Sequence, residues 1–318
     1  MPLQHNKRYT PPSLWQGRND GNNALRIHQY ITYLDLNTSF PRQQNASGFL
    51  GFACEEGIKR NQGRPGAVEG PVALRRSLAN IPLHNLDAPL FDCGTITCTD
   101  GDLESAQDAL AEAVSLMITN GIRPIVLGGG HEMAWGNFQG ISRANPSIDC
   151  AIINIDAHFD IRPLTSDLKG TSGTPFQQIY TARRQKNLDF TYACIGIQQT
   201  GNTSQLFDSA EEMGIKYVLA ESFYTEGTGE ALALIKELAR KHAHIYLTIC
   251  LDVFAAPFAP GVSAPQPLGL LPWHVIPLLQ FLAKTGKLIS VDIAELSPPH
   301  DRDNTTATLA AALLAQLL

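Results

Sequence analysis

The sequence predicts an α/β protein with a mainly parallel sheet that helices cover on both faces. Short apolar runs rich in β-branched residues alternate with longer segments of helical periodicity along nearly the whole chain, which indicates βαβ units. The runs are continuous, as expected for strands that are buried on both faces. No repeat or convincing linker divides the 318 residues, so we expect a single domain. Pattern alone also allows a TIM barrel, which shares this alternation.

The composition is that of an ordinary globular protein and argues against several functional classes. Hydrophobic residues make up 44% of the chain and charged residues 17%. A net charge of −6 and the lack of a Lys/Arg-rich run argue against a nucleic-acid partner. We expect no membrane span, because no apolar stretch approaches roughly 18 residues, and no signal peptide. Six scattered cysteines suggest reduced thiols, so we expect a cytoplasmic protein.

The first part of the chain is polar and contains several prolines. We therefore expect residues 1–45 to form an extension that packs on the body, and residues 46–318 to form the α/β domain. The stretch 55–71 is too rich in glycine for a regular element, and it predicts a long functional loop.

The remaining elements follow from periodicity and from residues that begin or end helices. Predicted strands are 48–54, 90–93, 124–127, 151–155, 191–197, 216–219, 245–251 and 288–293. Predicted helices are 72–79, 102–120, 205–213, 229–241, 272–284 and 305–318. The clearest helix has an apolar stripe, Asp102 as its cap and Gly121 at its end. Pro272 is well placed as the first residue of another helix.

The stretch 151–160, AIINIDAHFD, joins a buried strand to three potential ligands. Asp156, His158 and Asp160 follow the apolar run at alternate positions, so an extended chain would place them on one side. Two carboxylates and an imidazole at the end of a buried strand are costly without a partner, and a divalent cation is the obvious one. A lone motif of this kind is also compatible with polar residues that simply face water.

Three further strands end in polar residues, which are His131, Cys250 with Asp252, and Glu295. Ligand sites in open α/β sheets lie beyond the carboxyl ends of the strands, so these side chains could meet those of the central stretch. The resulting site would be rich in oxygen, which suits Mn²⁺ better than structural Zn²⁺. The glycine run at 128–130 lacks the spacing of a phosphate loop, and we interpret it as a sharp turn that points His131 inward.

At this level of detail the sequence resembles the ureohydrolase family, which includes arginase and agmatinase. The three signature blocks are GGGHE at 128–132, DAHFD at 156–160 and LDVFAAPFAPGVSAP at 251–265. Resemblance to the formimidoylglutamase branch rests on GGGHE, RNQGRPGAVEGP at 60–71, FDIRP at 159–163, SGTPF at 172–176 and GVSAP at 261–265. The resemblance covers about residues 48–300 and implies an arginase-like three-layer αβα sandwich with two bridged Mn²⁺ ions per subunit.

The resemblance also implies two metal sites that share one carboxylate. His131, Asp156 and Asp160 would hold one ion. Asp156, His158 and Asp252 would hold the other.

Cys250 departs from the family pattern, because it stands where the family has a further bridging aspartate. A thiol is a softer ligand and is largely protonated at neutral pH, whereas Mn²⁺ prefers oxygen. We therefore include Cys250 as a weak candidate ligand, and we expect weaker Mn²⁺ binding than in a typical relative.

The activity that the resemblance implies is hydrolysis of N-formimidoyl-L-glutamate to L-glutamate and formamide, a reaction of histidine degradation, by water that the metals activate. Asp160 would accept a hydrogen bond from that water and shuttle its proton. Glu295 matches the family glutamate that pairs with the amidinium group of the substrate. The two substrate carboxylates would need cations or polar donors, for which the loop candidates are Arg60, Asn61, Arg64, Arg162, Ser172 and Thr174.

The expected partners are a small-molecule dicarboxylate substrate and further copies of the chain in a homo-oligomer. Two other functions stay open. One is a different ureohydrolase activity, such as that of an agmatinase or guanidinobutyrase. The other is an arginase-like protein with weak or no activity, whose metal site is impaired because Cys250 replaces a bridging aspartate.

Overall fold

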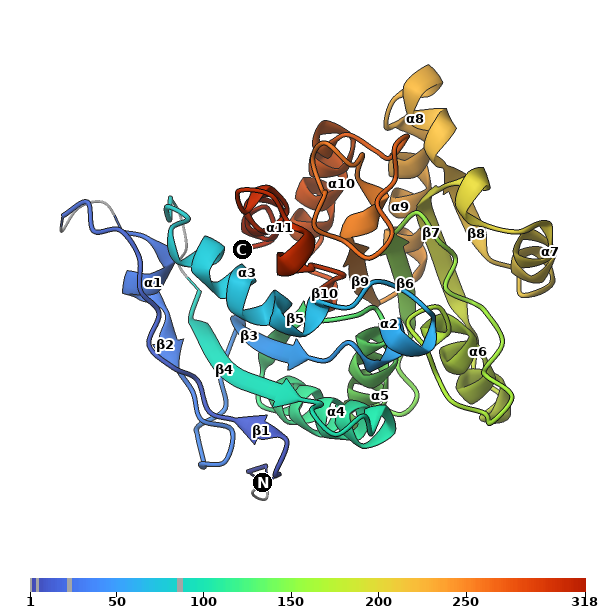
Figure 1. Ribbon diagram of the computed structural model, residues 1–318. Helices are drawn as coiled ribbons and strands as arrows, with labels where there is room; N and C mark the ends of the chain where they lie inside the picture. Colours follow the sequence, from blue (N-terminus) through green and yellow to red (C-terminus); the bar gives the residue numbers. More distant parts are fainter. Residues whose placement is uncertain (1, 4–5, 22–24, 85–87) are drawn as a thin grey trace.

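The structure, a computed structural model, describes residues 2–3, 6–21, 25–84 and 88–318 of the chain (Figure 1). Its strands are β1 (Tyr9–Thr10), β2 (Thr32–Tyr33), β3 (Ala46–Ala53), β4 (Leu90–Thr97), β5 (Ile122–Gly128), β6 (Cys150–Ile155), β7 (Thr191–Ile197), β8 (Lys216–Leu219), β9 (His244–Cys250) and β10 (Leu288–Ala294). Within the described residues these ten strands form one sheet in the order β1-β4-β3-β5-β10-β9-β6-β7-β8, with β2 paired to β4. The strand order is open, which excludes the TIM barrel.

The sheet is parallel except at its outer edge. Only β1 pairs antiparallel with its neighbour β4, while the other pairings between these strands are parallel. The predicted α/β class with a mainly parallel sheet is therefore confirmed.

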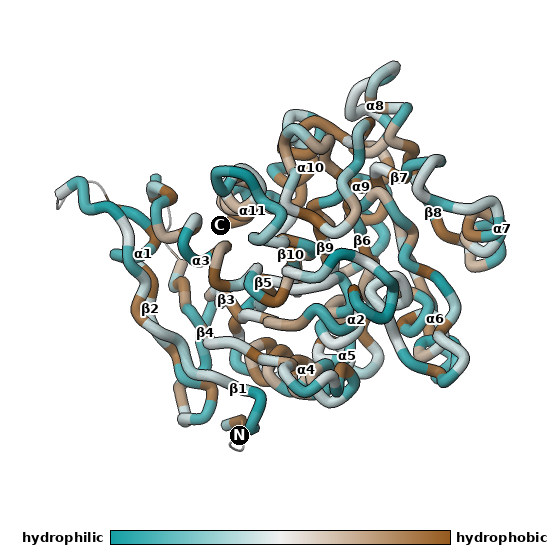
Figure 2. The backbone as a smooth tube through the Cα atoms, in the orientation of Figure 1, coloured by the Kyte–Doolittle hydropathy of each residue, from teal (hydrophilic) through white to brown (hydrophobic). Residues whose placement is uncertain are grey.

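Helices cover both faces of the sheet, which confirms the three-layer αβα sandwich. One face packs against α4 (Leu103–Thr119), α5 (Met133–Ala144), α6 (Pro175–Gln185) and α7 (Ser204–Glu212). The other packs against α3 (Gly70–Ala79), α8 (Ala220–Glu226), α9 (Gly229–Lys241), α10 (Pro272–Lys284) and α11 (Thr305–Ala315). Alternate residues of β5 enter the two cores, Val126 the first and Ile125 and Leu127 the second. Figure 2 shows apolar stretches along the strands and helices, and hydrophilic loops between them.

Two predicted helix starts are confirmed at the level of single residues. The Asp102 side chain accepts a hydrogen bond from the backbone N–H of Ser105 at 3.1 Å and so caps α4. Pro272 is the first residue of α10. No helix in the described ranges is both long enough and apolar enough to cross a bilayer.

The residues before β3 widen the sheet at its outer edge. Both β1 and β2 pair with β4, and a short helix, α1 (Ile27–Tyr30), contacts α3. The buried indole of Trp15 donates to Asp92 of β4 at 2.7 Å, and Arg75 of α3 pairs with the same carboxylate at 2.9 Å. The segment that we expected to pack on the body thus also adds strands to it.

The stretch 55–71 contains regular structure that we did not predict. It holds α2 (Glu56–Arg60), a 3-10 turn (Ala67–Glu69) and the start of α3. Ion pairs at helical spacing, Glu55 with Lys59 and Glu56 with Arg60, support α2. Helices α5, α6 and α8 were also missed.

Candidate metal centre

The carboxyl ends of four adjacent strands, β5, β10, β9 and β6, meet at one edge of the sheet. Ala294, the last residue of β10, lies in register with Cys250 of β9, and Ile155 of β6 lies in register with Ile249. The structure therefore brings together the polar residues that follow these strands.

Strand β6 ends at Ile155, and the chain then bends instead of staying extended. The backbone N–H of His158 donates to Oδ1 of Asp156 at 2.7 Å. Asp160 has a positive φ of 50°, a conformation that aspartate tolerates better than most residues. The three side chains thus converge through a bent segment, so the two-residue period of an extended chain does not apply to them.

His131 stands between β5 and α5 because the preceding glycine run passes very close to β3. A Cβ atom on Gly129 would lie 1.9 Å from the carbonyl oxygen of Cys54, so only glycine fits this approach. The imidazole is then directed at the central stretch, where Nδ1 lies 3.0 Å from Oδ2 of Asp156 and 2.8 Å from Oδ2 of Asp160.

His158 faces a second pair of carboxylates. Its Nδ1 lies 3.5 Å from Oδ1 of Asp156 and 3.3 Å from Oδ2 of Asp252. Burial lowers the pKa of His158, but the Asp252 and Asp156 carboxylates outweigh it and raise the pKa well above its usual value. Asp156 and Asp160 act in the same way on the pKa of buried His131. Both imidazoles therefore sit in strongly negative surroundings.

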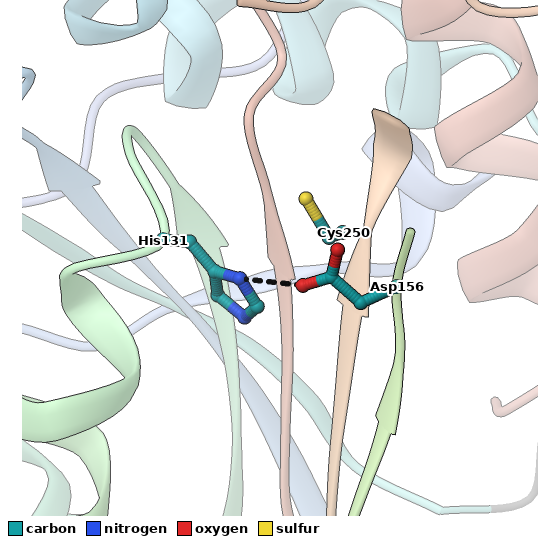
Figure 3. Close-up of side chains that lie close together, drawn as sticks. All are labelled: His131, Asp156 and Cys250. Carbon is teal, nitrogen blue, oxygen red and sulfur yellow. Dashed lines mark ion pairs between the residues drawn. The ribbon is translucent and has the colours of Figure 1, made fainter. Parts of the chain in front are cut away.

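The structure contains two sets of potential ligand atoms, and within each set the atoms lie within 4.8 Å of one another. Asp156 belongs to both sets. The first set contains His131, Asp156 and Cys250, whose side chains Figure 3 shows close together, and the second contains Asp156, His158 and Asp252. Burial, followed by the charges of Asp156 and Asp252, raises the pKa of the Cys250 thiol well above its usual value. The thiol is therefore neutral among charged neighbours.

These donors fit a divalent cation. Nδ1 of His131 and Oδ1 of Asp252 are buried and lack a hydrogen-bond partner within the described ranges, although oppositely charged groups lie close to both residues. Such orphaned polar atoms are costly, and one cation in each ligand set would satisfy the orphaned atom of that set. Carboxylate oxygens and imidazole nitrogens suit Mn²⁺, whereas Sγ of Cys250 is a softer donor.

Glu295 brings another buried carboxylate to the same place. Its Oε1 accepts a hydrogen bond from the His131 backbone N–H at 2.9 Å, and its Oε2 accepts one from the Ser263 hydroxyl. Burial and the charge of Asp252 raise the pKa of Glu295 to about 7. Its φ of 71° is unusual for a glutamate, and such strain is common at functional sites.

The site opens into a cavity of about 200 Å³. Strand-end residues that line it include His131, His158, Asp160, Cys250, Asp252 and Glu295. Asn61, Arg162 and Ser172 line it from the loops, and Asn61 Nδ2 donates to the Ser172 hydroxyl at 3.1 Å. In the part of the chain that the structure describes, the Arg162 guanidinium has no hydrogen bond or ion pair, so its charge is available to a ligand.

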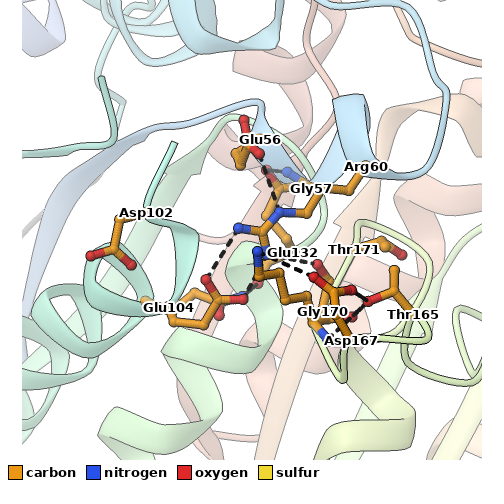
Figure 4. Close-up of polar contacts among 12 residues, drawn as sticks. Glu56, Gly57, Arg60, Asp102, Glu104, Glu132, Thr165, Asp167, Gly170 and Thr171 are labelled. Carbon is orange, nitrogen blue, oxygen red and sulfur yellow. Dashed lines mark hydrogen bonds and ion pairs between the residues drawn. The ribbon is translucent and has the colours of Figure 1, made fainter. Parts of the chain in front are cut away.

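The other three predicted binding residues do not line the cavity. The guanidinium of Arg60 lies 3.2 Å from Glu56 and 2.6 Å from Glu104, in the polar cluster of Figure 4. Arg64 donates to two backbone carbonyls, and the Thr174 hydroxyl bonds to neighbouring groups around the start of α6. Their polar groups are thus used within the protein.

Two residues of the site were not singled out from the sequence. Ser263 lies in the GVSAP block and bonds to Glu295, so the motif contained the signal. The hydroxyl of Thr248 lies 2.8 Å from Nε2 of His131. Thr248 is a polar residue within an apolar strand, two positions before Cys250. This position is the only feature of the sequence that points to a role for Thr248 in the site.

Comparison with known proteins identifies the family. The sequence model of the arginase family matches residues 45–318. The chain is 45% identical over 313 residues to a formimidoylglutamase of Legionella pneumophila (strain Paris), covering 98% of this chain and 97% of the relative. Its fold resembles the formimidoylglutamase of Bacillus subtilis (TM-score 0.83, 18% identity, covering 95% of this chain and 93% of that one). It also resembles a variant Trypanosoma cruzi formiminoglutamase solved with Mn²⁺ (TM-score 0.80, 24% identity, covering 93% and 97%). The chain is therefore a hydrolase that belongs to the arginase family.

Proposed function

We propose that this protein hydrolyses N-formimidoyl-L-glutamate to L-glutamate and formamide in a manganese-dependent reaction. The observation that carries the proposal is the cavity in which Glu295 and the unpaired guanidinium of Arg162 lie beside two ligand sets sharing Asp156. The formimidoylglutamase from Legionella pneumophila, similar over nearly the full length, supports the same substrate.

The proposed manganese ligands combine carboxylates and imidazoles of the two donor sets with Asp160, whose Oδ2 lies 2.8 Å from Nδ1 of His131. His131, Asp156 and Asp160 would hold one ion, and Asp156, His158 and Asp252 the other. Bound Mn²⁺ would act as a Lewis acid that makes hydroxide available near neutral pH. The manganese in the similar Trypanosoma cruzi structure supports this choice of metal.

The protein's own residues would orient the substrate and move the proton. The Glu295 carboxylate would accept hydrogen bonds from the formimidoyl N–H groups and hold the carbon for attack by water. Asp160, which lies 2.8 Å from His131, would take a proton from that water and pass it to the departing amine nitrogen. Cleavage of the C–N bond then gives formamide and the free amine of glutamate.

The substrate carboxylates would be bound from the loops. Arg162 offers a cation that has no partner among the described residues, and Asn61 and Ser172 offer an amide and a hydroxyl. We assign Arg60, Arg64 and Thr174 to the support of this wall, because their polar groups are engaged elsewhere. A cationic amine such as agmatine would be repelled by Arg162, so the alternative of an agmatinase is disfavoured.

Metal-stripped protein should be assayed with and without added Mn²⁺ on formimidoylglutamate, agmatine and 4-guanidinobutyrate. We expect Mn²⁺-dependent release of formamide and glutamate from the first substrate alone. Urea release from agmatine or 4-guanidinobutyrate would contradict the proposed activity and show a different ureohydrolase activity. Inactivity on all three with Mn²⁺ bound would identify an impaired member of the family.

A further inference from the structure

His131 makes a second buried contact on the side of its ring that faces away from the carboxylates. Its Nε2 lies 2.8 Å from Oγ1 of Thr248. Thr248 belongs to β9, and in the sheet register it is the direct neighbour of Asp292 on β10. His131 is 1% exposed, and Thr248 and Asp292 are fully buried, so water does not compete for these groups.

The two oxygens of the Asp292 carboxylate have very different surroundings. Oδ2 accepts from Asn137 Nδ2 at 2.8 Å and from the Tyr246 hydroxyl. Oδ1 is buried and has no hydrogen-bond partner within the described residues. Burial raises the pKa of Asp292, and the charge of His131 and the Thr248 hydroxyl oppose that effect. An acceptor that lacks a donor therefore belongs to the residue next to Thr248 in the sheet register.

The number of protons on the hydroxyl and on the imidazole limits the directions that these hydrogen bonds can take. A hydroxyl donates one proton, and a neutral imidazole carries one N–H. When Thr248 donates to Oδ1 of Asp292, its oxygen accepts from Nε2–H of His131, and Nδ1 keeps a lone pair for a cation. If Thr248 donated to Nε2 instead, Nδ1 would carry the proton and could not ligate a metal.

We propose that Thr248 and Asp292 form a positioning pair that fixes the tautomer and the orientation of His131 for metal binding. Neither residue lines the cavity, so neither is expected to touch the substrate. Outer hydrogen-bond partners of metal-ligating histidines commonly act in this way. The inference rests on the proposed function, because it concerns how the same site holds Mn²⁺.

The first test is a titration of Mn²⁺ into metal-stripped wild type, Thr248→Val and Thr248→Ser. Valine has nearly the shape of threonine but no hydroxyl, whereas serine keeps the hydroxyl. We expect the valine variant to bind the Mn²⁺ ion at His131 about 10- to 100-fold less tightly than wild type. The Mn²⁺ affinity of the serine variant should stay within about threefold of wild type. If Thr248 only filled space, serine would not restore Mn²⁺ affinity, because serine leaves a larger cavity than valine does. Equal Mn²⁺ affinity in wild type and Thr248→Val would overturn the inference.

Asp292→Asn provides a second test that does not depend on the folding of the valine variant. Its amide can keep an oxygen towards Asn137 and Tyr246 and turn its NH₂ towards Thr248. The Thr248 hydroxyl would then donate to His131 and favour the wrong tautomer, so we expect a similar loss of Mn²⁺ affinity. Unchanged affinity in a folded Asp292→Asn protein would contradict the pair.

Mn²⁺ affinity separates this inference from the proposed function. If wild type binds Mn²⁺ more tightly than Thr248→Val, as expected, but releases no formamide, only the proposed activity is overturned. Active wild type whose Mn²⁺ affinity does not depend on Thr248 or Asp292 would overturn only the positioning pair. Wild type that fails to bind Mn²⁺ would overturn both.

Discussion

A thiol occupies the place where the family resemblance implies a bridging aspartate. Sγ of Cys250 lies within 4.8 Å of ligand atoms of His131 and Asp156, so the side chain is present in the site. Burial and the neighbouring carboxylates keep this thiol protonated, because they raise its pKa well above the usual value. The site therefore has one negative ligand fewer than an aspartate would give it.

Cys250→Asp is expected to bind Mn²⁺ about tenfold or more tightly than wild type, and to be more active at limiting metal. The reason is that a carboxylate adds the negative oxygen donor that Mn²⁺ prefers. The measurement is a titration of Mn²⁺ into both metal-stripped proteins, with Cys250→Ser as a neutral control. Equal affinity and activity in wild type and Cys250→Asp would show that the thiol is harmless.

Glu295→Gln is expected to lower turnover of formimidoylglutamate by at least about tenfold. One charge-assisted hydrogen bond contributes roughly 1.5–3 kcal/mol, and the amide cannot replace the carboxylate as the partner of an amidinium group. Steady-state kinetics measure the effect, and thermal unfolding verifies that the variant is folded. Unchanged kinetics would remove Glu295 from the substrate site.

Asp156→Ala is expected to abolish Mn²⁺ binding at both positions, because Asp156 is the residue common to the two ligand sets. Asp252→Ala, the matched variant, should lose only one ion. Metal analysis of the purified, Mn²⁺-dialysed proteins compares them. Two ions per chain in Asp156→Ala would contradict the assignment.

At the scale of elements, strands and motif positions could be predicted, whereas helices next to the motifs could not. β7 and β8 have the predicted bounds, and both are short runs in which aromatic, β-branched and other apolar residues predominate. α5 was missed because Gly136 and Gly140 lower its helix propensity. Both glycines pack against α4, where a Cβ on Gly140 would lie 2.6 Å from Val114, so tertiary packing overrides propensity. The convergence of Asp156 and His158 likewise depends on a bend that no period reveals.

Arg162 lines the cavity and its guanidinium has no partner within the described residues, whereas Arg60, the last residue of α2, is paired. Exchanging each for methionine separates their roles. We expect Arg162→Met to raise KM for formimidoylglutamate about tenfold or more, because one charge-assisted contact to a carboxylate is lost. Arg60→Met should change KM much less and should mainly loosen the contact between α2 and α4, because Arg60 is paired with Glu56 and Glu104. Steady-state kinetics and thermal unfolding of both variants test this. A larger change of KM in Arg60→Met would reverse the assignment.

At the scale of the whole molecule, the fold concentrates buried acidic groups at one edge of the sheet. Asp156, Asp160, Asp252 and Glu295 approach one another there, and burial and mutual repulsion raise the pKa of Asp160 and Asp252. Without a cation, the protonated imidazoles of His131 and His158 compensate the charge of the carboxylates that they contact. The stability of the metal-free protein should therefore depend on the protonation of His131 and His158.

Removing the metal is expected to lower the midpoint of thermal unfolding, and the loss should grow as pH rises above about 6.5. In the folded protein the pKa of each imidazole is raised. The contribution of each protonated imidazole to the stability of the metal-free protein is therefore fully present below the unfolded-state pKa, and it disappears as pH rises through the folded-state pKa. Mn²⁺-bound imidazoles are neutral ligands, so the loaded protein does not lose this contribution. Bound Mn²⁺ also stabilises the folded state by mass action, by about 2.7 kcal/mol at a free concentration 100 times Kd.

Thermal unfolding from pH 6 to pH 9, in excess Mn²⁺ and in excess chelator, measures the difference between the two states. The gap between the two midpoints should widen steadily with pH. His158→Asn removes one titrating imidazole from the metal-free site, so the chelated variant should show a flatter dependence on pH than chelated wild type. Parallel curves for the loaded and chelated wild type would mean that the two histidines do not balance the carboxylates in the metal-free fold.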